Sequence, residues 1–564
     1  MQLLQHFKEL TVRPKNAQEL KGLILQLAIQ GKLTANWRKE NPTIKLNNEK
    51  LTGISEKTLS FLNKESESIN QLDVPSTWLK LKFRTLFEMQ GGSQPPKSKF
   101  SSTERDGYVR LYQIRDFGKR PVPVYVPEDS VSKRCTEDDV MIGRYGASIG
   151  KIFYGKNGAY NVALVRLIWS RELLEQNFVY QIFSSYYMQE FFQNCTRSAQ
   201  AGFNKTDMGK LNIPLPPLEE QKEIVNVVET LFKEVEQLEQ LTVERINLKE
   251  DFVTSALNQL TTNNANQEWV FLQDHFKSFF NETSNIKKLR ETVLQLAVQG
   301  KLTADWRASH PELVSGSHHA SQLLKRIQEE KAQLIADKKI KKEKALPPIT
   351  KEEIPYGLPE GWVWCRLQDV FKDLRYGTSK KCGYKLGVNP VLRIPNLKKG
   401  GIDITDLKTT TLSEKELKDL SLTKGDLLII RSNGSENLVG RSSVVTNVGI
   451  GYSFAGYLVR LQVFTNHIDS SYLHTVLESS MIRTAIEGPL RTTSGVKNIN
   501  STEISKLIIP IPPLEEQKAI VEKVNALMGL CDRLEQEVQQ SQEHSEMLMQ
   551  SCLREVFEGE KELI

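Results

Sequence analysis

The sequence predicts an α+β protein in which two mixed α/β domains, related by an approximate twofold symmetry, are separated by long antiparallel coiled-coil helices. Three observations support this prediction. The chain repeats two motifs, dissimilar stretches of similar length lie between the repeats, and a regular apolar spacing follows each copy of the second motif. A length of 564 residues also exceeds what one hydrophobic core usually serves and suggests three or four units.

The repeats show that the chain is an internal duplication. The first motif reads LKGLILQLAIQGKLTANWR from Leu20 and LRETVLQLAVQGKLTADWR from Leu289, an offset of 289 − 20 = 269 residues. The second reads IPLPPLEEQKEIV from Ile213 and IPIPPLEEQKAIV from Ile509, an offset of 509 − 213 = 296 residues. Identity at most positions over such lengths is not expected by chance.

Each copy of the first motif predicts a short helix, over residues 18–30 and 284–300. The apolar runs end at Gly31 and Gly300, which are typical of helix C-caps. The central long helix is followed by its short partner, whereas the equivalent partner of the C-terminal long helix lies at the N-terminus. This circular order predicts neighbouring chain termini.

Two inserts, residues 74–215 and 355–510, lie between the motifs, and each opens with a tryptophan segment. Short β-rich runs and one amphipathic helix in each predict the same mixed α/β fold with different polar positions. Comparison of the inserts pairs three sets of residues: Asp139 with Asp426, Arg144 with Arg431, and Arg110 with Arg393. We expect the two aspartates to hold turns or arginines.

Each copy of the second motif predicts the start of a long helix, because its prolines suit a first turn and its glutamates suit the positive end of the helix dipole. Residues 218–260 and 514–556 could each form a helix of about 65 Å at about 1.5 Å per residue. Apolar residues at spacings of four and three indicate a coiled-coil seam, which we expect to bind partner chains. The seam comprises Ile224, Val228, Leu231, Val235 and Leu238, and then Ile520, Val524, Leu527, Leu534 and Val538.

The predicted domain boundaries follow from these elements. They are an N-terminal helical segment that packs near the C-terminal helix (1–73), the first insert (74–215), a central helical spacer (216–310), an exposed charged helix with a proline linker (311–354), the second insert (355–510) and a C-terminal spacer helix (511–564).

Charge separates the inserts from the long helices. Residues 74–215 hold 20 Lys and Arg against 13 Asp and Glu, and residues 355–510 hold 20 against 14. The long helices are acidic. Residues 218–262 hold 4 Lys and Arg against 10 Asp and Glu, and residues 514–564 hold 5 Lys and Arg against 12 Asp and Glu. Because phosphate neutralisation is a main source of affinity for DNA, the inserts are expected to contact nucleic acid and the helices to contact protein.

Several other classes of protein are disfavoured. No apolar stretch is long enough to cross a membrane and the N-terminus does not resemble a signal peptide, which favours the cytoplasm. The six cysteines form no CxxC pair, and the His318–His319 pair lies in a polar run, so no metal site is expected. The run GASIGKI from Gly146 has three residues between its glycines and Ile152 after its lysine, which does not fit a phosphate loop.

Taken together, the two divergent inserts, the LQLAxQGKLT and IPxPPLEEQ repeats and the long helices resemble the specificity subunits of type I restriction-modification systems. The resemblance covers nearly the whole chain. It implies a non-catalytic subunit in which each insert is a target recognition domain that reads one half of a bipartite, asymmetric DNA sequence. The helices would set the distance between the half-sites.

The resemblance also implies the partners. Two methyltransferase subunits, which bring S-adenosylmethionine and modify adenine, would dock on the helices, and an endonuclease subunit that uses ATP and Mg would join them. No cofactor is expected on this chain.

We expect polar side chains at certain positions of the inserts to contact base edges or phosphate. In the first insert they are Arg110, Gln113, Arg115, Arg144, Tyr145, Ser148, Asn204 and Lys205. In the second they are Arg393, Asn396, Lys398, Arg431, Asn433, Ser435, Arg441, Lys497 and Asn498.

Two alternatives stay open on the sequence. One is a non-enzymatic coiled-coil DNA-binding regulator or scaffold without methyltransferase partners. The other is a solitary modification enzyme, against which the absence of a methylase signature and of a glycine-rich cofactor turn counts.

Overall fold

The computed structural model describes residues 14–44, 73–196, 203–262, 267–313, 315–398, 401–488, 491–493 and 496–558. The chain divides into two compact units, Met1–Ile246 with Glu543–Ile564 (unit 1) and Asn247–Gln542 (unit 2). Each unit therefore combines one insert with parts of both long helices. Among the described residues, no helix is long and apolar enough to cross a membrane.

The insert of unit 1 is built on two small four-stranded sheets. An antiparallel sheet has the order β2-β9-β6-β7, and a second sheet has the order β4-β3-β8-β5, in which β3 and β8 are parallel. The pairing of β1 with β10 joins the start of the insert to its end. The strands are β1 (Leu79–Lys82), β2 (Glu88–Gly91), β3 (Tyr108–Tyr112), β4 (Tyr125–Pro127), β5 (Arg134–Cys135), β6 (Val140–Gly143), β7 (Ile152–Tyr154), β8 (Gly158–Tyr160), β9 (Leu164–Ile168) and β10 (Asn212–Leu215).

The insert of unit 2 repeats this arrangement. Its antiparallel sheet has the order β12-β21-β17-β19, its second sheet has the order β16-β13-β20 with β13 and β20 parallel, and β11 pairs with β24. A further sheet, β18-β23-β22, and the pair β14-β15 are described only here. The strands are β11 (Val363–Arg366), β12 (Phe371–Tyr376), β13 (Asn389–Leu392), β14 (Leu397–Lys398), β15 (Gly401–Ile402), β16 (Lys408–Thr410), β17 (Leu427–Ile430), β18 (Ser432–Asn433), β19 (Ser442–Val444), β20 (Ser453–Phe454), β21 (Leu458–Val463), β22 (Arg491–Thr493), β23 (Val496–Asn498) and β24 (Ile508–Ile511).

The amphipathic helix expected in each insert is two helices instead. In unit 1, α6 (Gln176–Ser184) ends before α7 (Tyr186–Thr196), and in unit 2, α16 (Ser470–Glu478) ends before α17 (Ser480–Glu487). Ser185 and Ser479 lie at the breaks in extended conformation, and each buried hydroxyl donates to the carbonyl three residues earlier. These local bonds compete with helix continuation, which apolar spacing alone does not reveal.

The two long helices agree with their predicted positions to within two residues. They are α9 (Leu218–Thr262) and α19 (Leu514–Glu558), and the short helices are α2 (Pro14–Ile29) and α12 (Thr283–Val298). The remaining helices are α3 (Ala35–Glu40), α5 (Phe83–Leu86), α8 (Lys205–Met208), α10 (Gln267–Asp274), α11 (Phe276–Phe279), α13 (Ala304–Ser309), α14 (Ala320–Ala336), α15 (Glu414–Leu420) and α18 (Ser501–Lys506). Helix α14 is not free in solution, because it buries Leu323 and Ile327 in the unit 2 core.

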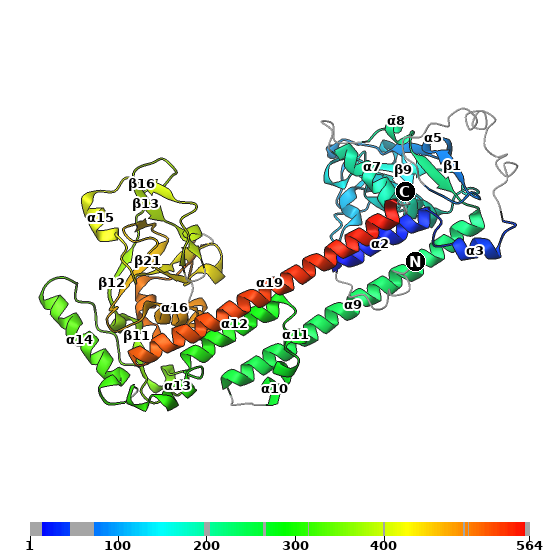
Figure 1. Cartoon of the computed structure of the whole chain (residues 1–564). Helices are drawn as coiled ribbons and strands as arrows, with labels where there is room; N and C mark the ends of the chain where they lie inside the picture. Colours follow the sequence, from blue (N-terminus) through cyan, green and yellow to red (C-terminus); the bar gives the residue numbers. More distant parts are fainter. Residues whose placement is uncertain are drawn as a thin grey trace. The chain divides into compact units, whose positions relative to one another are not determined.

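Helix α2 contacts both long helices of unit 1, α9 as well as the predicted partner α19. It runs antiparallel to α9, since Lys21 pairs with Glu236 and Thr34 with Glu220. Its Lys15 Nζ lies 2.7 Å from Glu546 Oε2 of α19, so the first described helix contacts the last (Figure 1). The prediction of neighbouring termini itself concerns residues outside those described.

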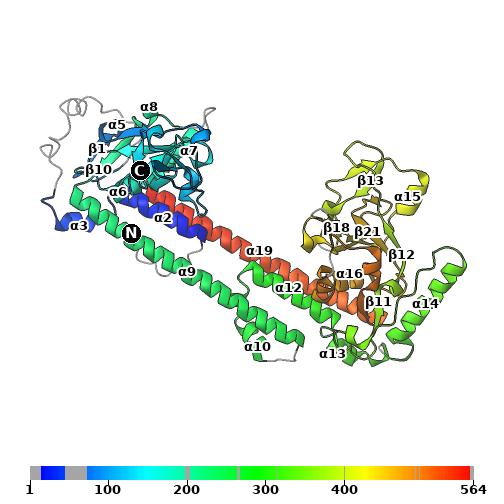
Figure 2. The same ribbon diagram turned by 180° about the vertical axis from the view of Figure 1, so that it is seen from behind.

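Helix α12 has the equivalent position in unit 2. It runs antiparallel to α19, where Arg290 pairs with Asp532 at 2.7 Å and with Glu535 at 2.9 Å (Figure 2). Its Lys288 pairs with Glu250 of α9 at 2.9 Å. Each short helix thus contacts both long helices within its own unit.

Candidate nucleic-acid interface

The two repeated motifs meet at a buried glutamate in unit 1. Glu220, from PPLEEQ, accepts hydrogen bonds from Thr34 Oγ1 at 2.7 Å and from Trp78 Nε1 at 2.8 Å, and it forms an ion pair with Arg38. The Glu220 side chain is only 1% exposed. We call these residues, together with Gly31, the Glu220 cluster. The cluster joins α2, the start of the insert and the start of α9.

Unit 2 contains the same set of contacts. Glu516 accepts hydrogen bonds from Thr303 Oγ1 at 2.7 Å and from Trp362 Nε1 at 2.8 Å, and it forms an ion pair with Arg307. With Gly300 these residues form the Glu516 cluster. A buried carboxylate needs such partners because an unpaired charge in this environment is strongly unfavourable.

The glycine of each cluster confirms the predicted helix C-caps. Gly31 and Gly300 both have φ +69°, the left-handed conformation that favours glycine at this position. A Cβ would lie 2.6 Å from Pro75 Cγ at Gly31 and 2.7 Å from Pro359 Cγ at Gly300. Glycine is therefore required both by backbone conformation and by the close approach of the insert.

The glutamine of PPLEEQ fixes the start of each long helix to the insert. Gln221 Nε2 donates to the carbonyls of Pro216 and Leu173, and its oxygen accepts from the Glu175 amide. Gln517 makes the equivalent bonds in unit 2, with Pro512, His467 and Asp469. The repeated motifs thus specify how an insert is attached to its helices.

Strand register confirms two of the predicted equivalences between the inserts. Gly143 pairs with Leu164 as Ile430 pairs with Leu458, which makes Arg144 and Arg431 equivalent. By the same register Asp139 and Asp426 are equivalent. Each of these carboxylates accepts a backbone amide three residues earlier, and Asp139 also pairs with Arg166 at 3.4 Å, so they do hold turns and arginines.

The third equivalence, Arg110 with Arg393, is wrong. The parallel pairs place Tyr112 opposite Tyr160 and Leu392 opposite Phe454, which makes Gln113 the equivalent of Arg393. Gln113 and Arg393 each precede a short turn. In each case the side chain three residues later accepts a hydrogen bond from their backbone amide. Alignment by residue type had shifted the inserts by three positions.

Three residues predicted to contact DNA in unit 1 form one surface loop. Arg144, Tyr145 and Ser148 lie between β6 and β7, and the Arg144 guanidinium lies 5.2 Å from the centre of the Tyr145 ring, which is 46% exposed. The other exposed candidates, Arg115, Asn204 and Lys205, lie on other segments.

Arg110 and Gln113 have internal roles instead. Arg110 pairs at 2.9 Å with the buried Asp116, which also accepts the Gln113 amide. The Arg110 guanidinium lies 5.4 Å from the ring centres of Tyr112 and Tyr125. The predicted contact of Arg110 with DNA therefore does not fit its surroundings.

In unit 2 the structure brings five candidates together. Strand β18 pairs Ser432 with Asn498 and Asn433 with Lys497, directly after Arg431. The Arg431 guanidinium lies 4.7 Å from the Tyr376 ring centre, and Lys497 pairs with Glu436 at 3.4 Å. The gathered candidates are Arg431, Asn433, Ser435, Lys497 and Asn498.

Three other unit 2 candidates are occupied within the insert or lie apart from this sheet. Asn396 is 1% exposed, and its amide donates to the carbonyls of Asp403 and Asp406 at 2.9 Å. Arg393 pairs with Asp406 at 2.9 Å. Lys398 is exposed on β14. Asn396 cannot reach a base edge, because its polar atoms are buried and already bonded.

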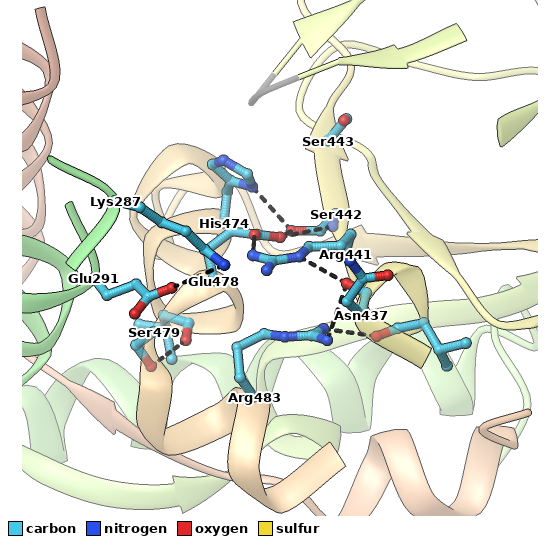
Figure 3. A network of polar contacts seen from close by, with 12 residues as sticks. Lys287, Glu291, Asn437, Arg441, Ser442, Ser443, His474, Glu478, Ser479 and Arg483 are labelled. Carbon is cyan, nitrogen blue, oxygen red and sulfur yellow. Dashed lines mark hydrogen bonds and ion pairs between the residues drawn. The ribbon is translucent and has the colours of Figure 1, made fainter. Parts of the chain in front are cut away.

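Arg441 belongs to a polar network that braces β19 against α16 (Figure 3). Glu478 accepts from the Arg441 guanidinium and from the Ser442 amide, and the Ser442 hydroxyl lies 2.9 Å from His474 Nδ1. Burial lowers the pKa of His474 below its usual 6.5, which favours the neutral imidazole. Arg441 therefore stabilises the loop between β17 and β19.

The predicted coiled-coil seam is covered by the chain itself. Ile224, Val228 and Val235 are buried in the core of unit 1, with Leu231 and Leu238 packed against it. In unit 2 the equivalent residues Ile520, Val524, Leu527, Leu534 and Val538 line two cores in the same way. The short helices and inserts fill this seam, so these side chains do not offer a surface to a partner as predicted.

The sequence predicts the C-cap role of the cluster glycines, but it does not predict that the threonine, arginine and tryptophan of each cluster bind the buried glutamate. Their signal was present, because Thr, Arg, Trp and Glu recur at equivalent places in both copies. Within the described residues, no group of three or more His, Cys, Asp or Glu side chains could hold a metal ion.

Both inserts match a known protein family. The family described as "Type I restriction modification DNA specificity domain" matches residues 75–248 and 359–543. The two matched segments contain nearly all of the two inserts and the first part of each long helix.

The chain is also similar to specificity subunits of type I restriction enzymes. The chain is 30% identical over 330 residues to the EcoAI type I restriction enzyme specificity subunit of Escherichia coli, covering 57% of this chain and about half (54%) of that relative. It is 26% identical over 566 positions to the EcoEI specificity subunit of Escherichia coli, covering 93% of this chain and 91% of that relative. The HsdS subunit crystal structure from Thermoanaerobacter tengcongensis covers 86% of this chain and 98% of its own, at 16% identity and TM-score 0.40.

Proposed function

The chain belongs to the family of type I restriction-modification DNA specificity proteins, and we propose that it selects the bipartite DNA sequence on which such a complex acts. Each insert reads one half of the sequence, and the helices dock the methyltransferase subunits. Specificity subunits are not catalytic, so methylation and cleavage reside in the partner subunits.

The observation that carries this proposal is the duplication of a basic insert on an identical attachment. The Glu220 and Glu516 clusters hold the two inserts by the same contacts, while the inserts differ in their polar loops. An identical attachment with different reading surfaces is what recognition of two unrelated half-sites requires. The basic excess of the inserts supplies the sequence-independent attraction to phosphate.

We assign base reading to the equivalent loops that follow β6 and β17. Arg144, Tyr145 and Ser148 form this surface in unit 1, and Arg431, Asn433, Ser435, Lys497 and Asn498 form it in unit 2. Arginine and asparagine can make paired hydrogen bonds to guanine and adenine in the major groove. The two loops begin at equivalent arginines, Arg144 and Arg431, but they differ in length and in the residues that follow, so each insert would read different bases.

The partner surface lies on the outer faces of the long helices, since the seam is buried. Leu241 and Leu248, seven residues apart on α9, are exposed, as are Leu530 and Met547 on α19. Apolar side chains on an acidic helix fit a protein partner better than DNA. Two methyltransferase subunits with S-adenosylmethionine would bind here, an endonuclease using ATP and Mg would join them, and the complex would act in the cytoplasm.

Co-expression with the methyltransferase subunit of its own system tests the proposal. The expected result is co-purification of the two chains and adenine methylation, mapped by long-read sequencing, at one split sequence with a fixed unread gap. A chain that binds no methyltransferase, or that transfers methyl groups alone, would overturn it.

A further inference from the structure

In both units a short loop lies between two isolated β-bridges of the same type. In unit 1 Ser93 bridges Asn161 in parallel and Ser101 bridges Tyr125 in antiparallel fashion. In unit 2 the corresponding bridges are Thr378 to Ala455 and Gly383 to Thr409. These frames define the first lysine loop (residues 94–100) and the second lysine loop (residues 379–382).

Both loops present lysine to solvent. The first reads QPPKSKF and the second SKKC, and Lys97, Lys99, Lys380 and Lys381 are all exposed. Lys380 pairs with Glu416 at 2.8 Å. Within the described part of the chain, no carboxylate lies within ion-pair distance of Lys97, Lys99 or Lys381, whereas many arginines of the inserts are already paired.

The segments that follow the lysine loops differ completely. In unit 1 residues 102–107 read STERDG, whereas in unit 2 residues 384–388 read YKLGV. We call the latter the apolar loop. Its Tyr384, Leu386 and Val388 are 66%, 51% and 85% exposed, an unusual exposure for three neighbouring large apolar side chains.

The apolar loop is anchored at both ends by contacts with β16. The Gly383 and Thr409 amides donate to each other's carbonyls at 3.1 and 2.8 Å, and Thr410 Oγ1 donates to the Lys381 carbonyl at 3.0 Å. At Gly387 a Cβ would lie 2.3 Å from the Thr410 carbonyl carbon, so only glycine permits this approach. The backbone around the apolar loop is thus tied to β16, while its apolar side chains are exposed.

Resting on the proposed function, we infer that residues 379–388 contact the DNA half-site of unit 2, with lysine on phosphate and the apolar loop on base edges. The first lysine loop makes only the phosphate contact. Phosphates are present in every duplex, so the lysines that both loops share are suited to phosphate. Bases differ between half-sites, so the segments that differ between the two units are suited to base edges. Apolar side chains recognise the thymine methyl group in the major groove.

The phosphate contact is tested in the assembled methyltransferase complex with Lys97→Ala combined with Lys99→Ala. Affinity for target and non-target duplexes should fall equally, by about tenfold at moderate salt, and the slope of log affinity against log salt should fall by about 2. The methylated sequence should not change. The control is Lys325→Ala with Lys341→Ala, two exposed lysines that lie outside the inserts and the long helices, and this variant should bind like the parent.

The base contact is tested by Tyr384→Ser, Leu386→Ser and Val388→Ser together, with thermal unfolding to check that the fold is intact. Target affinity should fall at least tenfold while non-target affinity is unchanged. Methylome sequencing should show relaxed positions in one half-site, the one that changes when residues 355–510 are exchanged.

Unchanged target affinity, an equal loss on both duplexes, or relaxation in the other half-site would overturn the inference about the apolar loop. A double lysine variant that behaves like its control would overturn the phosphate contact. If the parent complex itself methylates no defined sequence, the proposed function fails instead, so the two failures are distinguishable.

Discussion

The two units attach their inserts identically but support their surface loops differently. At the attachment, Glu220 and Glu516 keep the same threonine, tryptophan and arginine partners with equal hydrogen-bond lengths. Behind the loops, unit 2 has the Ser442–His474–Glu478 network, whereas at the equivalent positions unit 1 has Ile152, Tyr180 and Ser184.

In unit 1, Tyr180 stacks on Tyr154 with ring centres 4.3 Å apart, in place of the polar network. Aromatic stacking and a satisfied polar network can each stabilise the same contact between sheet and helix. The attachment therefore allows little variation, whereas the support of the reading loops can change chemistry together with the loops themselves.

The largest effect should come from the attachment. Glu220→Ala removes the buried partner of Arg38, Thr34 and Trp78 and should lower the free energy of unfolding by about 3 to 5 kcal/mol. Hydrogen exchange should increase in unit 1 peptides, and Glu516→Ala should do the same in unit 2. The neighbouring exposed glutamates Glu219 and Glu515 provide matched alanine controls, which should have little effect. Equal effects of the buried and exposed glutamates would contradict the role of the clusters.

The next effect concerns the cluster glycines. Gly31→Ala and Gly300→Ala should each destabilise by about 2 kcal/mol, because alanine is strained at positive φ and its Cβ meets a proline. Gly22→Ala is the control, since a Cβ there has open space within a helix and should stabilise by about 0.5 to 1 kcal/mol. Denaturant titration measures all three, and a neutral Gly31→Ala would show that the cap is dispensable.

A smaller effect is expected from the unit 2 network. Arg441→Ala removes the ion pair with Glu478, but this arginine is 38% exposed, so the loss should be about 1 kcal/mol. Lys151 occupies the equivalent position in unit 1 and is exposed without an ion-pair partner among the described residues, so Lys151→Ala should leave stability unchanged. Comparison of the two variants by thermal unfolding distinguishes the two kinds of loop support.

The smallest effect is a pH dependence confined to unit 2. Since burial lowers the pKa of His474, the unfolded chain takes up a proton near pH 6.5 before the folded chain does. The free energy of unfolding should therefore fall as the pH falls below about 6.5, and His474 should contribute no pH dependence above it. His474→Gln should show a smaller loss between pH of about 7.5 and 5.5 in urea titrations, and an identical pH response of parent and variant would contradict this.

Much of the scaffold was predictable because it is repeated. The two long helices and the C-cap glycines follow from motifs that recur with nearly unchanged residues. The breaks at Ser185 and Ser479 were missed because a serine is compatible with a helix and only its local hydrogen bond stops it. The coiled-coil seam was recognised, but the sequence could not show that the chain covers it from within.

The site was less predictable for a physical reason. A polar residue on a loop can contact DNA or can satisfy the loop's own backbone, and its type does not distinguish the two. Asn396 and Arg110 illustrate the second case, because their bonds to Asp403, Asp406 and Asp116 depend on loop geometry. Strand register confirms the equivalence of Arg144 and Arg431. The same kind of evidence contradicts the equivalence of Arg110 and Arg393.

The central claim is that two independent readers share one attachment, and exchange of residues 74–215 tests it most directly. The segment is replaced by the corresponding insert of another specificity subunit that keeps the cluster residues, and methylated adenines are mapped across the genome of a host with the complete complex. The account predicts a new sequence in one half of the target, with the other half and the gap unchanged. A change in both halves would contradict it.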